Sequence, residues 1–136
     1  MSKIRRFEHD ELIDIYIKHL SKKHPFDICY KKVNYCFDRV RGEIDLLRLS
    51  EDTNGFLTTH IYEFKSNDNR KSRAKALRQL NKIKFGIPRN EPGFSRVKYY
   101  YARPFYRLEK NKTHSYLLID EYKEGKLSRL EEILLK

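Results

Sequence analysis

Apolar residues recur at helical spacing in two stretches of the chain. The first stretch covers residues 8–23, with apolar positions at Leu12, Ile13, Tyr16, Ile17 and Leu20. The second covers residues 69–85, with apolar positions at Ala76, Leu77, Leu80 and Ile83. Residues at this spacing share one face of a helix, so each stretch predicts an amphipathic helix. Pro25 ends the first helix, and Asp68, Asn69 or Ser72 caps the second.

Alternating apolar and polar residues predict a β-hairpin between the two helices. Residues 42–50 and 57–66 form its strands, and EDTNG joins them, in which Asn54-Gly55 is a typical turn pair. Residues 26–40 alternate in the same way and are rich in aromatic side chains. We expect one strand there, paired with the strand at 42–50.

The part of the chain after the second helix contains further predicted elements. They are a loop at 86–93, strands at 95–103 and 113–122, and a short closing helix at 127–135. Pro104 ends or bends the first of these strands. Ser128 is the expected cap of the closing helix, with Glu131 three residues later completing a capping box.

The order of these elements is helix, three strands, helix, two strands and a closing helix. It predicts an α/β or α+β fold, in which a central mixed sheet is flanked by helices. The chain has 136 residues, the size of one ordinary domain. We therefore expect residues 1–136 to form a single domain.

Composition narrows the range of functions. The net charge is +11, from 30 Lys and Arg against 19 Asp and Glu, which favours a polyanionic partner such as nucleic acid or an anionic membrane surface. No apolar run approaches the roughly 20 residues of a membrane span, and the first residues lack an apolar signal region. We expect a soluble, cytoplasmic protein. Cys29 and Cys36 lack the spacing of a zinc site, and we expect both to be reduced.

The predicted hairpin carries acidic residues where a half-buried strand normally carries apolar ones. Alternation places Glu43 and Asp45 on the same face of the first strand, and Glu63 and Lys65 on the same face of the second strand. The opposite faces are apolar, at Ile44 and Leu46 and at Tyr62 and Phe64. If the hairpin pairs symmetrically about Asn54, Asp45 lies opposite Glu63, and Glu43 lies opposite Lys65.

Cross-strand neighbours of this kind lie roughly 4.5–5.5 Å apart at Cβ. The carboxylates of Asp45 and Glu63 therefore repel unless a cation, a proton or Lys65 separates them. A hard divalent metal ion fits such a pair, because it prefers oxygen ligands and often keeps waters in its shell. Alternatively, these residues form cross-strand ion pairs on an ordinary solvated face. In either case, Glu43 stays open between two roles, a further metal ligand or the partner of Lys65.

The pattern GEID…EFK resembles the PD-(D/E)XK nuclease superfamily and is similar to its small stand-alone members, including archaeal Holliday junction resolvases. Asp45 matches the first strand acid of that pattern, and Glu63-Phe64-Lys65 matches its E-x-K. The resemblance implies a restriction-endonuclease-like core, Mg²⁺ or Mn²⁺ as cofactor and a homodimer. It also implies that the Phe64 carbonyl is a metal ligand and that Gln79, on the second helix, supports the site.

A glutamate of the first helix often joins the metal site in this superfamily. Glu8 lies beside Leu12 at the edge of the apolar face, whereas Glu11 points nearly away from that face. Glu8 is thus the first candidate for this glutamate, and Glu11 is the second. Alternatively, both are first-turn acids that complement the helix dipole.

The second predicted helix carries seven basic side chains and no acidic one. They are Arg70, Lys71, Arg73, Lys75, Arg78, Lys82 and Lys84. Solvated helix faces normally mix both charge signs, so this face is predicted to bind phosphates. Arg39 and Arg41, just before the hairpin acids, either touch phosphate or neutralise those acids.

Together these features predict a metal-dependent nuclease that acts on DNA. Asp45 and Glu63, with help from Glu8, hold the metal, and Lys65 positions the attacking water, helps to deprotonate it or steadies the transition-state charge. The basic helix holds the backbone without reading bases. Two alternatives remain: a non-catalytic nucleic-acid-binding protein, and an RNA endonuclease on the same fold.

Overall fold

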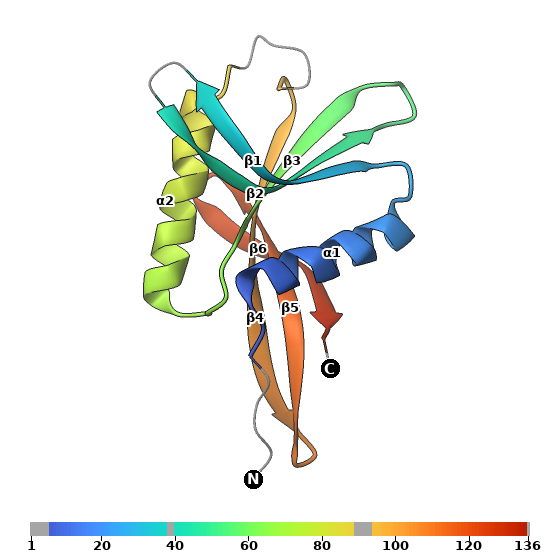
Figure 1. The fold of residues 1–136 in the computed structure, drawn as a ribbon, viewed down its shortest axis with the longest axis vertical. Helices are drawn as coiled ribbons and strands as arrows, with labels where there is room; N and C mark the ends of the chain where they lie inside the picture. Colours follow the sequence, from blue (N-terminus) through green and yellow to red (C-terminus); the bar gives the residue numbers. More distant parts are fainter. Residues whose placement is uncertain (1–5, 38–39, 89–93, 136) are drawn as a thin grey trace.

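The computed structural model describes residues 6–37, 40–88 and 94–135, and within them it is an α+β structure with two helices and six strands. The elements are α1 (His9–Lys23), β1 (Ile28–Phe37), β2 (Val40–Glu51), β3 (Leu57–Phe64), α2 (Arg70–Gly86), β4 (Val97–Glu109), β5 (Lys112–Lys123) and β6 (Lys126–Leu134). The strands form one mixed sheet in chain order, in which β3 and β4 are parallel and the other neighbours antiparallel (Figure 1). The predicted class and mixed sheet are confirmed.

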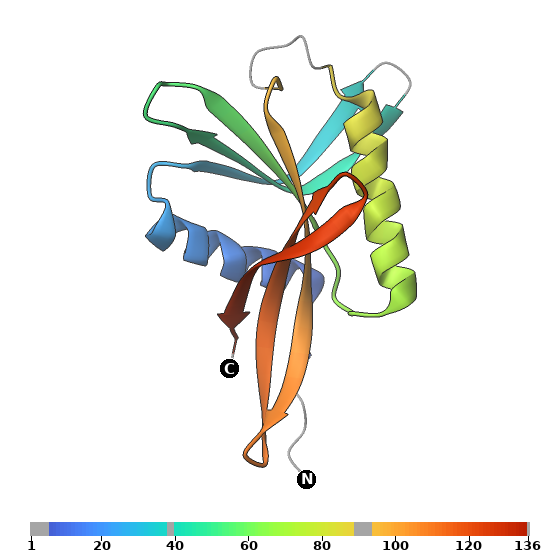
Figure 2. The ribbon, with the colours of Figure 1, turned by 180° about the vertical axis from the view of Figure 1, so that it is seen from behind.

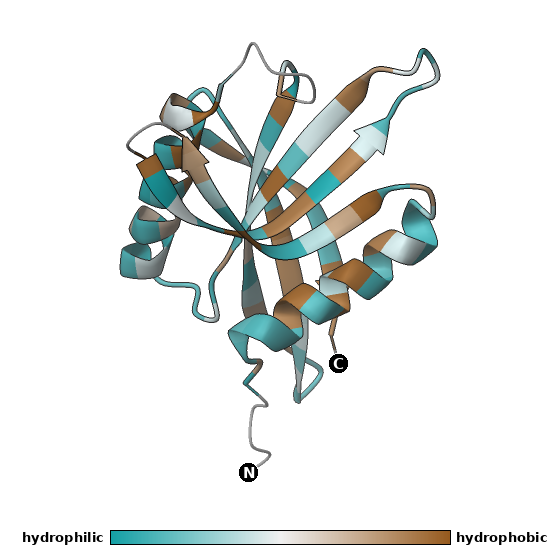
Figure 3. Ribbon diagram, turned by 45° about the horizontal axis from the view of Figure 1, so that its top comes forward, coloured by the Kyte–Doolittle hydropathy of each residue, from teal (hydrophilic) through white to brown (hydrophobic). Residues whose placement is uncertain are grey.

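The two helices cover different faces of the sheet and create two cores. Leu12, Tyr16 and Leu20 of α1 pack with strand residues that include Leu46 and Phe64. On the other face, α2 residues pack with strand residues that include Ile44 and Ile61. Helix α1 alternates apolar and hydrophilic residues along its length, while α2 is largely hydrophilic (Figure 3). Within the described residues, neither helix is long and apolar enough to cross a membrane.

The β2–β3 hairpin forms in the predicted register. Leu46 pairs with Tyr62 and Glu51 pairs with Leu57, so the pairing is symmetric about Asn54. Gly55 in the turn has a φ of 82°, a conformation that a glycine adopts without strain. The paired ladder ends at Leu46 and Tyr62. Asp45 directly precedes Leu46 and Glu63 directly follows Tyr62, so the predicted acids lie where the two strands separate.

The prediction that Ile44 and Leu46 share one apolar face is wrong. Leu46 packs in the α1 core, whereas Ile44 packs in the α2 core. Asp45 lies between them and is also buried, so three successive residues of β2 are buried and the strand does not alternate there. On the neighbouring strand, Lys32 lies between the partners of Ile44 and Leu46 and has a left-handed φ of 55°.

Helix α2 begins and packs as predicted. Asn69 is the cap among the three candidates, since its side chain accepts a hydrogen bond from the Ser72 amide at 2.8 Å. Ala76, Leu80 and Ile83 are buried. The loop predicted at 86–93 lies partly outside the described residues, and Gly86 is the last residue of the helix.

The expectation that Pro104 ends or bends the fourth strand is wrong. Pro104 lies within β4, opposite Leu117 of β5. The missing amide proton costs no ladder bond there, because β3 pairs with β4 only as far as Ala102 and has ended beside Pro104.

The prediction of a closing helix at 127–135 is also wrong, since these residues belong to β6 on the edge of the sheet (Figure 2). Glu124 and Gly125 both have positive φ angles, as a two-residue hairpin turn requires, and they return the chain alongside β5. Glu131 is therefore not part of a capping box. It accepts a hydrogen bond from the Tyr16 hydroxyl at 3.0 Å and contacts His19 at 2.8 Å.

Candidate active site

Two buried carboxyl groups meet where β2 and β3 separate. Asp45 is 6% exposed and Glu63 is 3% exposed. The Phe64 amide donates a hydrogen bond to Asp45 Oδ2 at 2.8 Å, which fixes the Asp45 side chain against β3. Burial raises the pKa of Glu63 well above its usual range, and the charge of Asp45 raises it further. Without a cation between them, the acid pair therefore retains a proton on Glu63.

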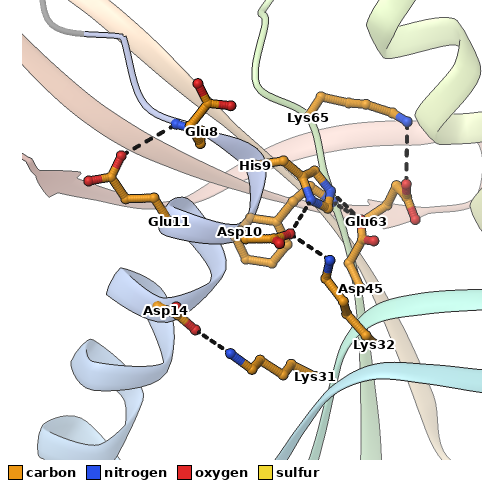
Figure 4. Close-up of polar contacts among 11 residues, drawn as sticks. Glu8, His9, Asp10, Glu11, Asp14, Lys31, Lys32, Asp45, Glu63 and Lys65 are labelled. Atoms are coloured by element: carbon orange, nitrogen blue, oxygen red, sulfur yellow. Dashed lines mark hydrogen bonds and ion pairs between the residues drawn. The ribbon is translucent and has the colours of Figure 1, made fainter.

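Lys65 is the cation that the structure places beside the acid pair on β3. Its Nζ lies 3.4 Å from Glu63 Oε1 (Figure 4). The same Nζ donates a hydrogen bond to Gln79 Oε1 at 2.8 Å. The structure thus brings Gln79 of α2 to Lys65, and its supporting role stays a prediction. Lys65 contacts these two residues instead of Glu43, which is exposed, so the alternative pairing of Glu43 with Lys65 is not observed.

His9 also contacts the acid pair and was not predicted. Its Nε2 lies 3.2 Å from Asp45 Oδ2, and its Nδ1 lies 3.1 Å from Asp10, which pairs with Lys32 at 2.7 Å. The hydrogen bond to Asp45 is the main cause that raises the pKa of His9 to about 9. No local sequence pattern links His9 to Asp45, because this contact spans 36 positions.

The first-helix glutamates are not brought to the acid pair. Glu8 is the N-cap of α1, and its amide is 3.4 Å from the Glu11 side chain in a capping box. Figure 4 shows both residues at the start of α1, with His9 between Glu8 and the acid pair. The alternative reading, in which they are helix-start acids, describes their contacts better, and His9 takes the place expected for Glu8.

The acid pair suits a divalent metal ion, although it supplies few ligands. Within the described residues, no group of three or more His, Cys, Asp and Glu side chains gathers to hold a metal. Mg²⁺ is commonly bound through one or two carboxylates, together with waters and substrate phosphates. Two adjoining buried carboxyl groups, one of which keeps a proton in the absence of a cation, fit that donor set. The Phe64 carbonyl stays a predicted ligand, and only its amide is seen to contact Asp45.

The basic residues of α2 lie beside this site. Arg70, Lys71, Arg73, Lys75, Arg78 and Lys82 are exposed, as is Arg41 on β2. Lys82 donates a hydrogen bond to the Arg41 carbonyl at 2.8 Å, so the basic surface continues from α2 onto β2. The contact between Lys65 and Gln79 joins this surface to the acid pair. Arg39 lies outside the described residues.

No protein-family model matches the chain, and no curated protein matches it as a relative. The function is therefore inferred from the chemistry of the site.

The raised pKa of Glu63 leads to a stability prediction for the metal-free protein. A carboxyl group whose pKa is higher in the folded state adds stability at low pH, and this stability is lost as the pH rises through the folded-state pKa. Glu63→Gln removes the buried charge but keeps the shape of the side chain. In EDTA at about pH 8 we expect this variant to be more stable than the wild type by about 1–3 kcal/mol.

Urea unfolding at several pH values measures this difference. At about pH 4 the gain should disappear, because Glu63 is then protonated in both states. Glu51→Gln, an exposed position at the other end of β2, is the control and should change the free energy of unfolding little at either pH. Equal stability of Glu63→Gln and wild type at about pH 8 would show that the acid pair is not under charge repulsion.

Proposed function

We propose that this protein is a metal-dependent DNA nuclease with a restriction-endonuclease-like core, related to the PD-(D/E)XK superfamily. One observation carries the proposal: the buried Asp45–Glu63 pair adjoins Lys65, which Gln79 holds in place. Burying two carboxyl groups side by side is costly even with Lys65 and His9 beside them, and such clusters with shifted pKa values favour a role beyond structure. A membrane-surface role has no comparable support.

Asp45 and Glu63 would hold Mg²⁺ or Mn²⁺ through their carboxylate oxygens. The bound cation would supply Lewis acidity to the scissile phosphate and lower the pKa of water. Lys65 is positioned to orient the attacking water by hydrogen bonding or to stabilise charge on the phosphate in the transition state. Gln79 accepts from Lys65 and so restricts where the ammonium group points. His9, 3.2 Å from Asp45 Oδ2, would help to orient that carboxylate.

The exposed basic residues of α2 would bind the sugar-phosphate backbone. Lys75 and Arg78 are both exposed and lie on the same helix as Gln79. Replacing both with glutamine should weaken DNA binding roughly tenfold and reduce the slope of log affinity against log salt concentration by about 2. Fluorescence anisotropy with labelled DNA in EDTA at several salt concentrations measures both quantities.

The matched control for this prediction replaces Lys110 and Lys112 with glutamine. Both are exposed and flank the β4–β5 turn, which Figure 1 shows at the end of the molecule away from α2. This variant has the same net charge as the α2 variant and should bind DNA nearly as the wild type does. If both variants lose affinity equally, net charge rather than the α2 surface governs binding.

A cleavage assay tests the proposed activity. Labelled single-stranded, duplex, flap and four-way-junction DNA would be incubated with the protein in Mg²⁺, Mn²⁺ or EDTA. We expect cleavage in either metal and none in EDTA. Binding without cleavage under every condition would support a non-catalytic nucleic-acid-binding protein, and cleavage of RNA alone would support an RNA endonuclease. A homodimer is part of the proposal, and sedimentation of the free protein tests it.

A further inference from the structure

A cavity of about 380 Å³ opens beside the candidate active site. Its lining includes Glu8, Ser66, Asn67, Asp68, Phe105 and Tyr106. The cavity exists because β3 stops pairing with β4 at Ala102, while β4 continues to Glu109. The chain leading into α1 and the segment between β3 and α2 form its other walls, and Figures 1 and 2 both show the start of α1 near β4.

The cavity adjoins the acid pair on two sides. Ser66 directly follows Lys65, whose ammonium group lies 3.4 Å from Glu63. Glu8 directly precedes His9, whose imidazole lies 3.2 Å from Asp45. A strand of nucleic acid with one phosphate at the acid pair would therefore bring a neighbouring nucleotide to this cavity.

The lining suits a flat, neutral ligand with hydrogen-bond donors. Tyr106 is a half-buried aromatic side chain on which a planar ring can stack. The Arg107 guanidinium already lies over the ring of Phe105, 5.5 Å from its centroid. The lining also contains Arg6, but the carboxylates of Glu8 and Asp68 outnumber its single positive charge. These carboxylates accept hydrogen bonds from amino groups on a base edge. Asn67 adds both a donor and an acceptor. A nucleobase has this combination of a planar face and a polar edge.

The segment that carries these polar residues is held in place before any ligand arrives. Asp68 lies 3.6 Å from Arg103 Nε and 3.8 Å from Arg73 Nη2. Arg103 is buried and is itself anchored by Asp120 at 2.9 Å. Both distances to Asp68 exceed that of a direct hydrogen bond, so its carboxylate is positioned by charge and retains lone pairs for a ligand.

We propose that this cavity, the base pocket, takes an unpaired nucleobase next to the bond that is cut. The inference rests on the proposed nuclease function and specifies its substrate class as DNA that is single-stranded at the cut, such as a flap or a free strand. A base inside a continuous duplex is stacked and paired, and removing it from the stack costs a few kcal/mol. Continuous duplex is therefore the poorer substrate.

Tyr106→Ala tests the base pocket in the full-length protein. We expect kcat/KM for flap or single-stranded DNA to fall about 10–100-fold, the range that loss of one stacked base implies. Tyr106→Phe keeps the ring and should stay near the wild-type value. The control is Tyr30→Ala, which removes a tyrosine of β1 that is 49% exposed and outside the pocket. It should leave cleavage unchanged.

A substrate with an abasic nucleotide beside the cleaved bond sharpens the test. The wild type should lose activity on it by the same factor as Tyr106→Ala loses on normal DNA, and Tyr106→Ala should lose nothing further. The base pocket would be overturned if the losses from Tyr106→Ala and from the abasic nucleotide were additive, or if Tyr30→Ala lost as much activity as Tyr106→Ala. Equal cleavage of continuous duplex and flap DNA by the wild type would also overturn it. These outcomes leave the nuclease function intact.

If the protein cuts no nucleic acid, the nuclease function fails, and binding in EDTA tests the pocket separately. Affinity for single-stranded DNA that falls in Tyr106→Ala but not in Tyr106→Phe or Tyr30→Ala would support a base-binding cavity. Unchanged affinity in Tyr106→Ala would overturn it.

Discussion

Asp45→Asn should reduce metal-dependent DNA cleavage by at least about 10³-fold, the effect expected when a carboxylate that holds a catalytic cation becomes neutral. Asparagine keeps the shape of the side chain and can still accept the hydrogen bond from the Phe64 amide. The fold should therefore persist. The variant removes the charge that raises the pKa of Glu63 but also weakens the contact of Asp45 with His9, so the two effects on stability oppose each other. Initial cleavage rates in Mg²⁺ measure the effect.

Measuring DNA affinity shows whether Asp45→Asn loses the cleavage step or the ability to bind DNA. In EDTA, anisotropy should show that Asp45→Asn binds DNA within about threefold of the wild type, because the α2 surface supplies most phosphate contacts. Asp14→Asn is the matched control, since Asp14 is exposed on α1 and pairs with Lys31 at 3.0 Å. It should cleave at the wild-type rate. Cleavage by Asp45→Asn within tenfold of the wild type would remove Asp45 from the active site.

Lys65→Ala should lower kcat by about 10²–10⁴-fold with little change in KM, as expected for a group that acts in the transition state. The variant leaves Glu63 without its nearest cation and Gln79 without its donor. We therefore also expect a modest loss of stability, which thermal unfolding records. Steady-state kinetics on the preferred DNA substrate separate kcat from KM.

Lys31→Ala is the control for this variant, because Lys31 is an exposed lysine of β1 that pairs only with Asp14 among the contacts described above. It should keep kcat. Lys65→Arg retains the charge but not the compact ammonium group, and should recover only part of the activity. A rise in KM with unchanged kcat in Lys65→Ala would instead make Lys65 a phosphate-binding residue.

The central hairpin was predictable because its signals are local. The Asn54-Gly55 turn sets the register, and the register brings the strand containing Asp45 beside the strand containing Glu63. The E-x-K spacing then places Lys65 beside Glu63 without further information. Gln79 was predictable in part, since helical spacing puts it on the border of the apolar stripe that faces the sheet.

The features that sequence reasoning missed depend on distant contacts. His9 reaches Asp45 only because α1 packs across the sheet, and no local pattern encodes that contact. The separation of Ile44 and Leu46 into two cores departs from the regular alternation on which the local pattern depends. The apolar positions within residues 127–135 are compatible with a helix. These residues form a strand because the turn at Glu124 and Gly125 returns the chain alongside β5.

The measurement that tests the central claim most directly is a calorimetric titration of Mn²⁺ into the protein, compared between wild type and Asp45→Asn. If the acid pair holds a divalent cation, the wild type should bind at least one Mn²⁺ per chain, and Asp45→Asn should lose that binding. Binding should also release protons to the buffer near neutral pH, because the cation displaces the proton that the raised pKa of Glu63 retains. No Mn²⁺ binding by the wild type, or the same binding in Asp45→Asn, would contradict the assignment of this site.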